Sequence, residues 1–408
     1  MKIGDHINEQ YTNCLFKSNG KVIVYYEFED KGFTALYQEI SDSESAGWDS
    51  PEENYSLINI TLSDSIGQGV NSMLIPISIE ENYIDTSDTE ISSSTFKDLK
   101  LKEEHIEEFL RKNIEVIFGE EETLLIVGQQ VNNKEKGRSD LTAIDENGNI
   151  VLIEIKRDVD DIKSRKEAFE FQAIRYAASY AKIKTPDELV NKIFSKYIEK
   201  HKKEFELGDL TPVEKGKRII NDFLVNNNSL KTFNQKQRII LVASSFDPQT
   251  LSAVAWLIAN NVDISCFSIM PLKINNQVFL QVDRVLPPSS LEDFYVEIKD
   301  NEAAELEKSP IGITRTNLPR MPKLFEWGLI KEGDKLYIKN HDKEASLAEV
   351  IDQRFVNYKG NKMTYNQWGQ DVTGWSSICI YEWAVKIDSD KTLDNLRREK
   401  LNEIDNEV

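Results

Sequence analysis

The chain contains little cysteine and little histidine. Its 408 residues include three cysteines (Cys14, Cys266 and Cys379) and four histidines. The cysteines are odd in number and far apart, and the histidines show no ligand spacing. These absences exclude a disulfide framework and a zinc site, and they are typical of a protein of the reducing cytoplasm.

Long apolar runs are also missing. No stretch approaches the roughly 20 apolar residues that a membrane-spanning helix needs. Residues 1–10 carry no apolar segment of the signal-peptide kind. We therefore expect a cytoplasmic protein with no membrane partner. The length of the chain and its 40% hydrophobic content predict two or three domains with ample cores.

Positive charge is scarce, because 50 Lys and Arg stand against 70 Asp and Glu, a net charge of −20. Proteins that grip phosphates generally carry a basic footprint, so the balance counts against simple nucleic-acid binding. The acidic residues concentrate in 39–122, however, and short basic stretches occur at 196–205 and 213–218. We expect weak, salt-sensitive DNA binding unless a metal, a second subunit or another module adds contacts.

Three regions differ in their residue patterns. Residues 1–95 alternate short apolar runs with polar turns, which predicts an all-β domain, and 85–97 are rich in Ser, Thr and Asp, which indicates a linker. Residues 96–300 mix helical and strand periods, which predicts an α/β core with a mixed sheet. Its expected elements are a helix over 100–118, a strand over 123–131, a hairpin over 138–156, a helix over 162–183, a charged helical insertion over 184–236, a strand over 238–246, a helix over 248–260, and strands over 264–270 and 277–285.

The hairpin carries the most informative residues of the chain. Asp140 opens one apolar run, and Glu154 and Lys156 end the next. Between the runs lies 146–149, whose Asn-Gly pair is a strong signal for a tight turn. Such a hairpin brings Asp140 near Glu154 and leaves Lys156 beside them. Paired carboxylates suit Mg²⁺ or Mn²⁺, and a lysine can orient a water or stabilise charge on a phosphate.

A purely structural interpretation of these residues stays open. Charged residues form 29% of the chain, so an isolated Glu-x-Lys carries little weight, and polar residues at strand ends are usually solvated. Glu154 and Lys156, however, interrupt a run that otherwise has the pattern of a buried strand. A buried charge is costly unless it is paired or bound to a metal.

Together these residues resemble the PD-(D/E)XK nuclease superfamily, and most closely its branch with RecB-type nuclease domains and the NucS endonucleases. That branch adds a Gln-x-x-x-Tyr motif on the next helix, matched by Gln172 and Tyr176. It also has an acid on a helix before the first strand, for which spacing favours Glu103 over Glu104 and Glu107. The strict proline before the first Asp is replaced here by Ser139, a departure that the branch often shows.

The resemblance implies a restriction-endonuclease-like αβββαβ core and a role for each matching residue. Asp140 and Glu154, with the carbonyl of Ile155, would hold Mg²⁺ or Mn²⁺. Lys156 would orient the attacking water, and Glu103 would complete the metal site. Gln172 and Tyr176 would support the site or contact the scissile strand. A plain core position for Tyr176 remains the alternative.

The last part of the chain has its own composition. Residues 299–315 are charged and aperiodic, which indicates a linker, and 316–400 hold four of the six tryptophans. Leu-Phe-x-x-Gly-Leu-Ile at 324–330, Tyr-Lys-Gly at 358–360 and Val-Thr-Gly-Trp at 372–375 resemble the RAMA domain, a small α+β module of restriction and methylation proteins. That resemblance implies DNA binding. Alternatively the tryptophans form a small core. A charged helical tail is expected over 386–408.

These features predict a metal-dependent DNA endonuclease that hydrolyses phosphodiester bonds, in restriction or antiviral (anti-phage) defence. Symmetric cleavage of a duplex needs two sites, so a homo-oligomer, a dimer or larger, is expected. The alternative is a non-cleaving DNA-binding or regulatory protein that keeps a nuclease fold. Complete Asp, Glu and Lys positions favour the enzyme, and the acidity of the chain favours the alternative.

Overall fold

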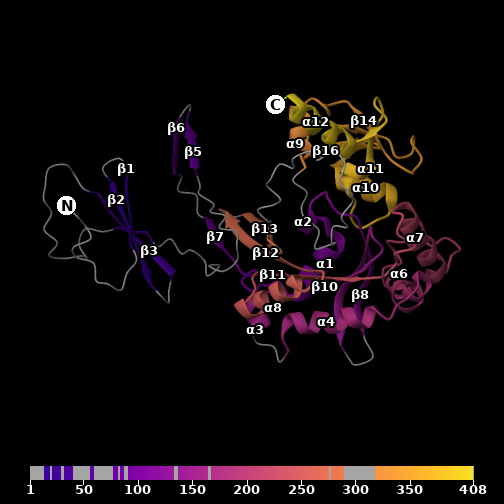
Figure 1. The fold of residues 1–408 in the computed structure, drawn as a ribbon, viewed down its shortest axis with the longest axis horizontal. Helices are drawn as coiled ribbons and strands as arrows, with labels where there is room; N and C mark the ends of the chain where they lie inside the picture. Colours follow the sequence, from indigo (N-terminus) through magenta and orange to yellow (C-terminus); the bar gives the residue numbers. More distant parts are fainter. Residues whose placement is uncertain are drawn as a thin grey trace. The chain divides into compact units, whose positions relative to one another are not determined.

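A computed structural model divides the chain into two compact units, Met1–Asn71 and Ser72–Val408 (Figure 1). It describes residues 94–132, 137–163, 167–274, 277–288 and 318–407, together with the backbone of seven strands before residue 94. None of the described helices is long and apolar enough to cross a membrane.

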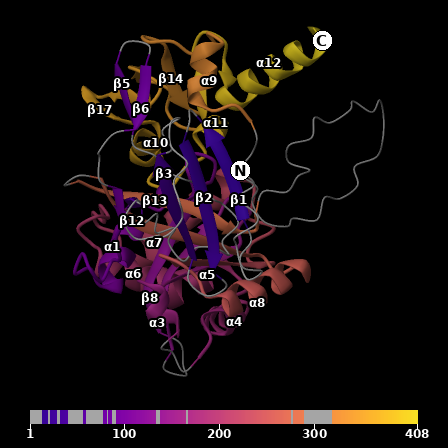
Figure 2. The same ribbon diagram turned by 90° about the vertical axis from the view of Figure 1, so that its left-hand side faces the viewer.

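The first unit contains four described strands, as expected for a region of alternating apolar residues. They form an antiparallel sheet in chain order, with β1, β2 and β3 side by side (Figure 2). The strands are β1 (Asn13–Ser18), β2 (Lys21–Phe28), β3 (Gly32–Glu39) and β4 (Ser56–Ile58).

The second unit is built on a mixed seven-stranded sheet of order β13-β12-β11-β10-β9-β8, with β7 also paired to β12. Strands β10, β11 and β12 are parallel neighbours, and the other pairings are antiparallel. The mixed α/β class is confirmed. The strands are β7 (Ile91–Ser93), β8 (Leu124–Asn132), β9 (Arg138–Asp145), β10 (Ile150–Ile155), β11 (Gln237–Ala243), β12 (Ile264–Ile274) and β13 (Gln277–Leu286).

The linker expected over 85–97 is wrong. Strand β7 lies inside it and pairs antiparallel with Leu272–Ile274 of β12. Just before it, β5 (Ile77–Glu80) and β6 (Tyr83–Thr86) form a two-stranded hairpin. Pairing depends on the partner strand, so a Ser-rich and Thr-rich segment can join a sheet without a local signal.

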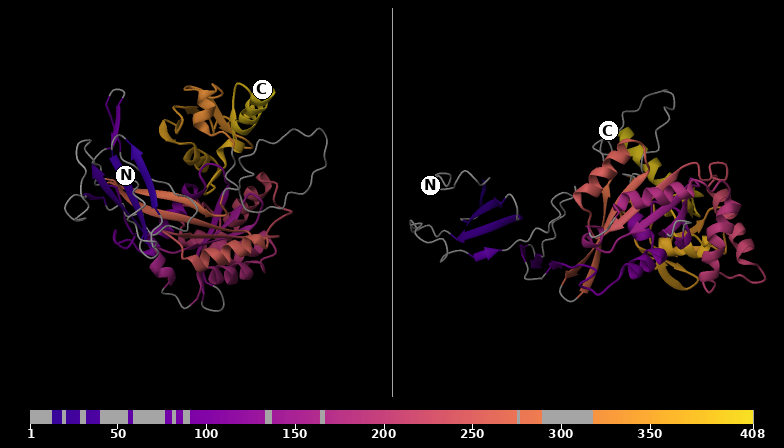
Figure 3. Two further views of the ribbon diagram at one scale, coloured as in Figure 1. Left: turned by 60° about the vertical axis from the view of Figure 1, so that its left-hand side comes forward. Right: turned by 90° about the horizontal axis from the view of Figure 1, so that it is seen from below.

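Helices cover both faces of the central sheet. In Figure 1, α1 (Glu103–Lys112) and α2 (Glu115–Phe118) lie above the strands, and α4 (Phe169–Tyr180) and α8 (Pro248–Ala259) lie below them. The left view of Figure 3 again places α4 and α8 together on one side. This burial of both faces explains the continuous apolar runs of β10 and β11.

Two expected helices are each divided. The helix predicted over 100–118 ends at Lys112, and α2 follows after Asn113 and Ile114. The helix predicted over 162–183 is α3 (Val159–Lys163) followed by α4, because Ala168 has an extended backbone with ψ of 140° just before Phe169. The expected insertion is helical: α5 (Pro186–Leu189), a π-helical turn (Val190–Phe194), α6 (Ser195–Lys200) and α7 (Pro212–Asn226).

Residues 318–407 form an antiparallel sheet of order β17-β16-β15-β14-β18-β19 with helices around it. Trp368, Trp375 and Trp383 are buried in its core, and Trp327 is half-buried, so the core interpretation of these tryptophans is confirmed. The linker expected over 299–315 lies outside the described residues. The elements are α9 (Met321–Glu326), β14 (Lys335–Ile338), β15 (Ala348–Val350), β16 (Phe355–Tyr358), β17 (Asn361–Thr364), α10 (Tyr365–Thr373), α11 (Ile380–Trp383), β18 (Ala384–Lys386), β19 (Lys391–Thr392) and the expected tail helix α12 (Leu393–Glu407).

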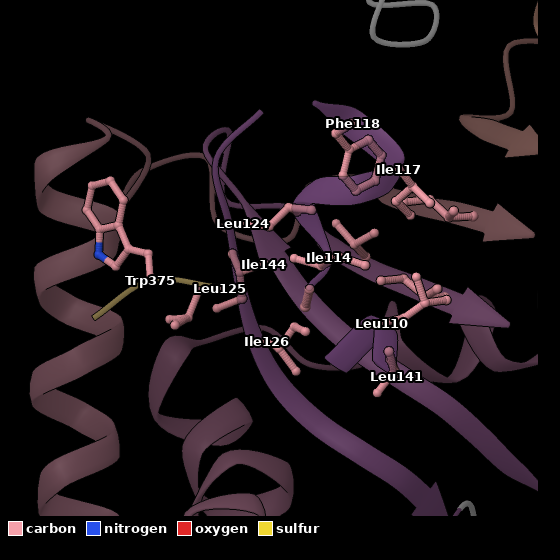
Figure 4. Close-up of a cluster of buried hydrophobic side chains, with 14 of the residues drawn as sticks. Leu110, Ile114, Ile117, Phe118, Leu124, Leu125, Ile126, Leu141, Ile144 and Trp375 are labelled. Carbon is pink, nitrogen blue, oxygen red and sulfur yellow. The ribbon is translucent and has the colours of Figure 1, made fainter. Parts of the chain in front are cut away.

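This C-terminal region shares a core with the central sheet. Ser377 forms a bridge with Leu124, and its hydroxyl donates to the Glu122 carbonyl at 2.9 Å. Trp375 packs edge-on against Phe223, 5.1 Å between ring centroids. Figure 4 shows Trp375 beside the buried leucines and isoleucines around β8. The two regions therefore belong to one compact unit.

Candidate functional site

The candidate site lies at the open end of the β9–β10 hairpin. The two strands are antiparallel, and their ladder ends with Ile153 opposite Leu141, one residue before Glu154 and one residue after Asp140. The predicted hairpin is confirmed, and its loop is 146–149. Gly148 has φ of +81°, a conformation that L side chains rarely adopt.

Three charged side chains are buried at this end. Asp140, Glu154 and Lys156 are 5%, 0% and 2% exposed. Burying a charged side chain costs free energy because the group loses its hydration, unless nearby partners compensate for the loss. The solvated interpretation of Glu154 and Lys156 is therefore wrong. Of the predicted contacts, the structure brings Lys156 to 4.0 Å from Asp140.

Lys156 connects the hairpin to α1. Its ammonium group donates to Glu103 Oε1 at 2.9 Å and to the Ile155 carbonyl, and it lies 4.0 Å from Asp140 Oδ2. It also lies 5.5 Å from the centroid of the Phe169 ring at the start of α4. One cation is thus shared between two acids from different elements.

Asp140 is held by the neighbouring strand. Its Oδ2 accepts the Ile155 amide hydrogen at 2.8 Å. Burial raises the pKa of the Asp140 carboxyl to about 6, although Lys156 and the Ile155 amide act in the opposite direction, and the acids Glu103 and Glu107 raise it further. A group with such a pKa binds a cation in exchange for a proton near neutral pH.

Gln172 and Tyr176 lie at the same place on α4. Gln172 Nε2 is 3.5 Å from Glu154 Oε2 and 3.3 Å from the Tyr176 hydroxyl. That hydroxyl accepts the Arg138 amide hydrogen at 2.9 Å. Tyr176 is buried in the core, as the helical spacing of the apolar residues on α4 suggests. Its hydroxyl group also makes a polar contact with the hairpin.

The acids of α1 differ in their surroundings. Glu104 is exposed, and Glu103 contacts Lys156 as described. Glu107 is buried, accepts a hydrogen bond from Gln130 at 3.2 Å through Oε2, and has no hydrogen-bond partner for Oε1 among the described residues. Burial raises the pKa of Glu107. Sequence reasoning ranked Glu107 low. Its spacing of four from Glu103, which places both on one helix face, was the available signal.

Ser139 connects β9 to α4 through its hydroxyl group. Its hydroxyl lies 2.6 Å from the Tyr180 hydroxyl, which also lies 2.8 Å from Thr142 Oγ1. Burial raises the pKa of Tyr180 to about 12, so the phenol stays neutral. These hydroxyls join β9 to α4 one turn beyond Tyr176.

No family model, curated protein or solved structure matches this chain. The residues of the candidate site form two chains of contacts. One runs from Glu103 through Lys156 to Asp140, and the other from Glu154 through Gln172 to Tyr176.

The donor set suits a hard divalent cation. Asp140, Glu154 and the Ile155 carbonyl are oxygen donors, and Mg²⁺ is usually held by one or two carboxylates while it keeps several waters. Among the described residues no three His, Cys, Asp or Glu side chains are grouped as a metal-binding set. The burial that raises the pKa of Asp140 is the cost that a bound cation would offset.

Proposed function

We propose that the protein is a metal-dependent DNA endonuclease that hydrolyses phosphodiester bonds. The observation that carries the proposal is the burial of Asp140, Glu154 and Lys156 at the same end of one hairpin, with Lys156 4.0 Å from Asp140. The order α1, β8, β9, β10, α4 and β11, with β10 and β11 parallel, supports it because it follows the αβββαβ order of PD-(D/E)XK nucleases.

Each residue would have a distinct task. Asp140 and Glu154, with the Ile155 carbonyl, would hold Mg²⁺ or Mn²⁺, which supplies charge for the phosphate and acidifies water. Lys156 orients the attacking water and offsets developing negative charge. Glu103 fixes the Lys156 ammonium group, and Gln172 positions the Glu154 carboxylate. Tyr176 anchors the start of β9 through the Arg138 amide.

A non-cleaving regulatory or DNA-binding protein is the second candidate. It is favoured by the net charge of −20 and by Lys156, which already donates to the carbonyl that a metal would use. In either case the N-terminal sheet and the C-terminal region would supply sensing or assembly, in restriction or antiviral defence.

Cleavage assays with matched variants decide between the two. Plasmid, linear duplex and single-stranded DNA would be incubated with Mg²⁺, with Mn²⁺ and with EDTA. Metal-dependent cleavage that is lost in Asp140→Asn, Glu154→Gln and Lys156→Met supports the proposal. Glu104→Gln is the control, since Glu104 is exposed on the same helix as Glu103. Cleavage that survives all three site substitutions would show that the activity has another source.

A further inference from the structure

The helical insertion between α4 and β11 carries lysines in different surroundings. Three of them lie 3.0–3.6 Å from a carboxylate of the same insertion: Lys192 from Glu188, Lys202 from Glu199 and Lys217 from Asp187. Lys200, the last residue of α6, has a neutral partner instead. Its ammonium group donates to the side-chain oxygen of Gln129 at 2.8 Å, and it forms no ion pair with a described residue. The positive charge of Lys200 is therefore held in place without being cancelled.

Gln129 brings this charge beside the candidate site. It lies on β8 and pairs with Leu141 of β9, the residue that directly follows Asp140. Helix α6 packs against β8, and Figure 1 shows the two beside each other at the edge of the sheet. Lys200 is exposed at that edge. A ligand that approaches Asp140 from this side would meet the ammonium group of Lys200.

Arg138 supplies a second positive charge near Asp140. The two residues are two apart on β9, so their side chains leave the strand on the same face of the sheet. Arg138 is exposed and forms no ion pair with a described residue. Its backbone is fixed, because its amide hydrogen is donated to the Tyr176 hydroxyl at 2.9 Å. The strand is thus anchored while the guanidinium group faces solvent.

Both charges act on the acids of the candidate site. Burial raises the pKa of Glu107, and the positive charges of Lys200 and Arg138 act in the opposite direction. Burial also raises the pKa of Asp140, and Glu107 is one of the acids that raise it further. The two cations therefore lie close enough to the proposed metal ligands to act on one bound anion together with them.

We propose that Lys200 and Arg138 bind the phosphates of the DNA strand on either side of the scissile phosphate. The inference rests on the proposed nuclease function and names the residues that hold its substrate. A chain of net charge −20 repels DNA over most of its surface, so binding needs positive charge where the strand lies. Lysine and arginine side chains contact phosphate oxygens, and such contacts position a duplex without reading its sequence.

Fluorescence anisotropy of a labelled DNA duplex tests the proposal, with Asp140→Asn as the parent protein so that the duplex is not cut. We expect Lys200→Gln and Arg138→Gln each to weaken binding about three- to tenfold at about 0.1 M salt. Each should also lower the slope of log K against log salt concentration by about one, because one phosphate contact is lost. The losses should be equal for duplexes of different sequence.

Lys192→Gln and Lys217→Gln are matched controls. Each removes one positive charge from the same insertion, but that charge is already paired with a carboxylate, so both variants should bind DNA as the parent does. Circular dichroism checks that all the variants fold. An equal loss in the controls would show an effect of net charge alone and would overturn the inference.

The same titrations separate this inference from the proposed function. If the wild-type chain cleaves DNA while Lys200→Gln and Arg138→Gln bind as tightly as the parent, the inference is overturned and the nuclease proposal stands. If the parent binds no DNA even at low salt and the wild-type chain cuts none, both are overturned.

Discussion

Glu103 and Glu107 occupy one face of α1 but face different partners. Glu103→Gln removes the acid that holds Lys156, and we expect a ten- to hundredfold loss of cleavage with little change in metal affinity.

Glu107→Gln neutralises a buried acid near Asp140, and we expect it to weaken Mg²⁺ binding by about ten- to a hundredfold. Calorimetric titration with Mg²⁺ separates the two. Unchanged Mg²⁺ affinity in Glu107→Gln would leave this acid a structural role.

The pKa of Asp140 makes a prediction about pH. It rises from 3.8 to about 6 on folding, so between these values the folded state retains a proton that the unfolded state loses. Stability of the metal-free protein should therefore fall as the pH rises through this window. Asp140→Asn should stabilise the metal-free protein by about 1–2 kcal/mol at about pH 8, with a smaller gain near about pH 4. Thermal melts at both pH values check this, and a variant less stable than wild type at the higher pH would contradict it.

Tyr176 combines packing with a polar contact, and two substitutions separate them. Tyr176→Phe keeps the buried ring and removes the hydroxyl that meets Arg138 and Gln172, so it should cost about 1 kcal/mol of stability. It should slow cleavage about tenfold or more if the hydroxyl positions Gln172. Tyr176→Ala should cost about 3–5 kcal/mol. Melts beside cleavage rates measure both effects, and full activity in Tyr176→Phe would reduce Tyr176 to a core residue.

At the scale of elements, the hairpin loop depends on one glycine. Gly148 has φ of +81°, and a Cβ there would lie 2.9 Å from the Ser229 carbonyl oxygen. Gly148→Ala should therefore destabilise the protein by about 1–3 kcal/mol. Gly208→Ala is a matched control: φ is also positive there, but no atom of the described residues lies within 4 Å of the added carbon. Chemical denaturation of both variants measures the difference, and equal losses would show that the Ser229 contact is relieved without cost.

Elements with a local signal were predictable, and those set by distant partners were not. The hairpin was predictable because Asn-Gly and a buried run occur within a few residues. The division of the helix before α4 was not, because the apolar period continues through Ala168 although its backbone is extended. Strand β7 has no local signal, since β12 supplies its hydrogen bonds. For the candidate site, motif spacing predicted Asp140, Glu154 and Lys156. Helical spacing places Glu107 on the same face as Glu103, but its burial is set by tertiary contacts and could not be predicted.

At the scale of the whole molecule, a buried ion pair joins the C-terminal region to the segment that leads into β8. Arg397 on α12 contacts Glu121 at 3.1 Å, and both side chains are buried. Arg397→Ala would leave Glu121 buried without this partner, which should cost about 3–5 kcal/mol. Arg398→Ala is the control, because Arg398 is exposed and pairs with Asp394 at the surface, a contact worth about 0–1 kcal/mol. Equal melting temperatures for the two variants would contradict this role.

The fastening of β7 to β12 has a mechanical consequence. The chain that arrives from the first unit is hydrogen-bonded to the central sheet before it reaches α1. Directly afterwards, the buried Asp158 carboxylate accepts the amide hydrogens of Phe96 and Lys97. A pull applied through residues 1–71 is therefore transmitted to the sheet at β7 before it reaches α1. Glu103 and its ion pair with Lys156 follow these contacts in the chain, so the pull would have to break the contacts before it reached the ion pair.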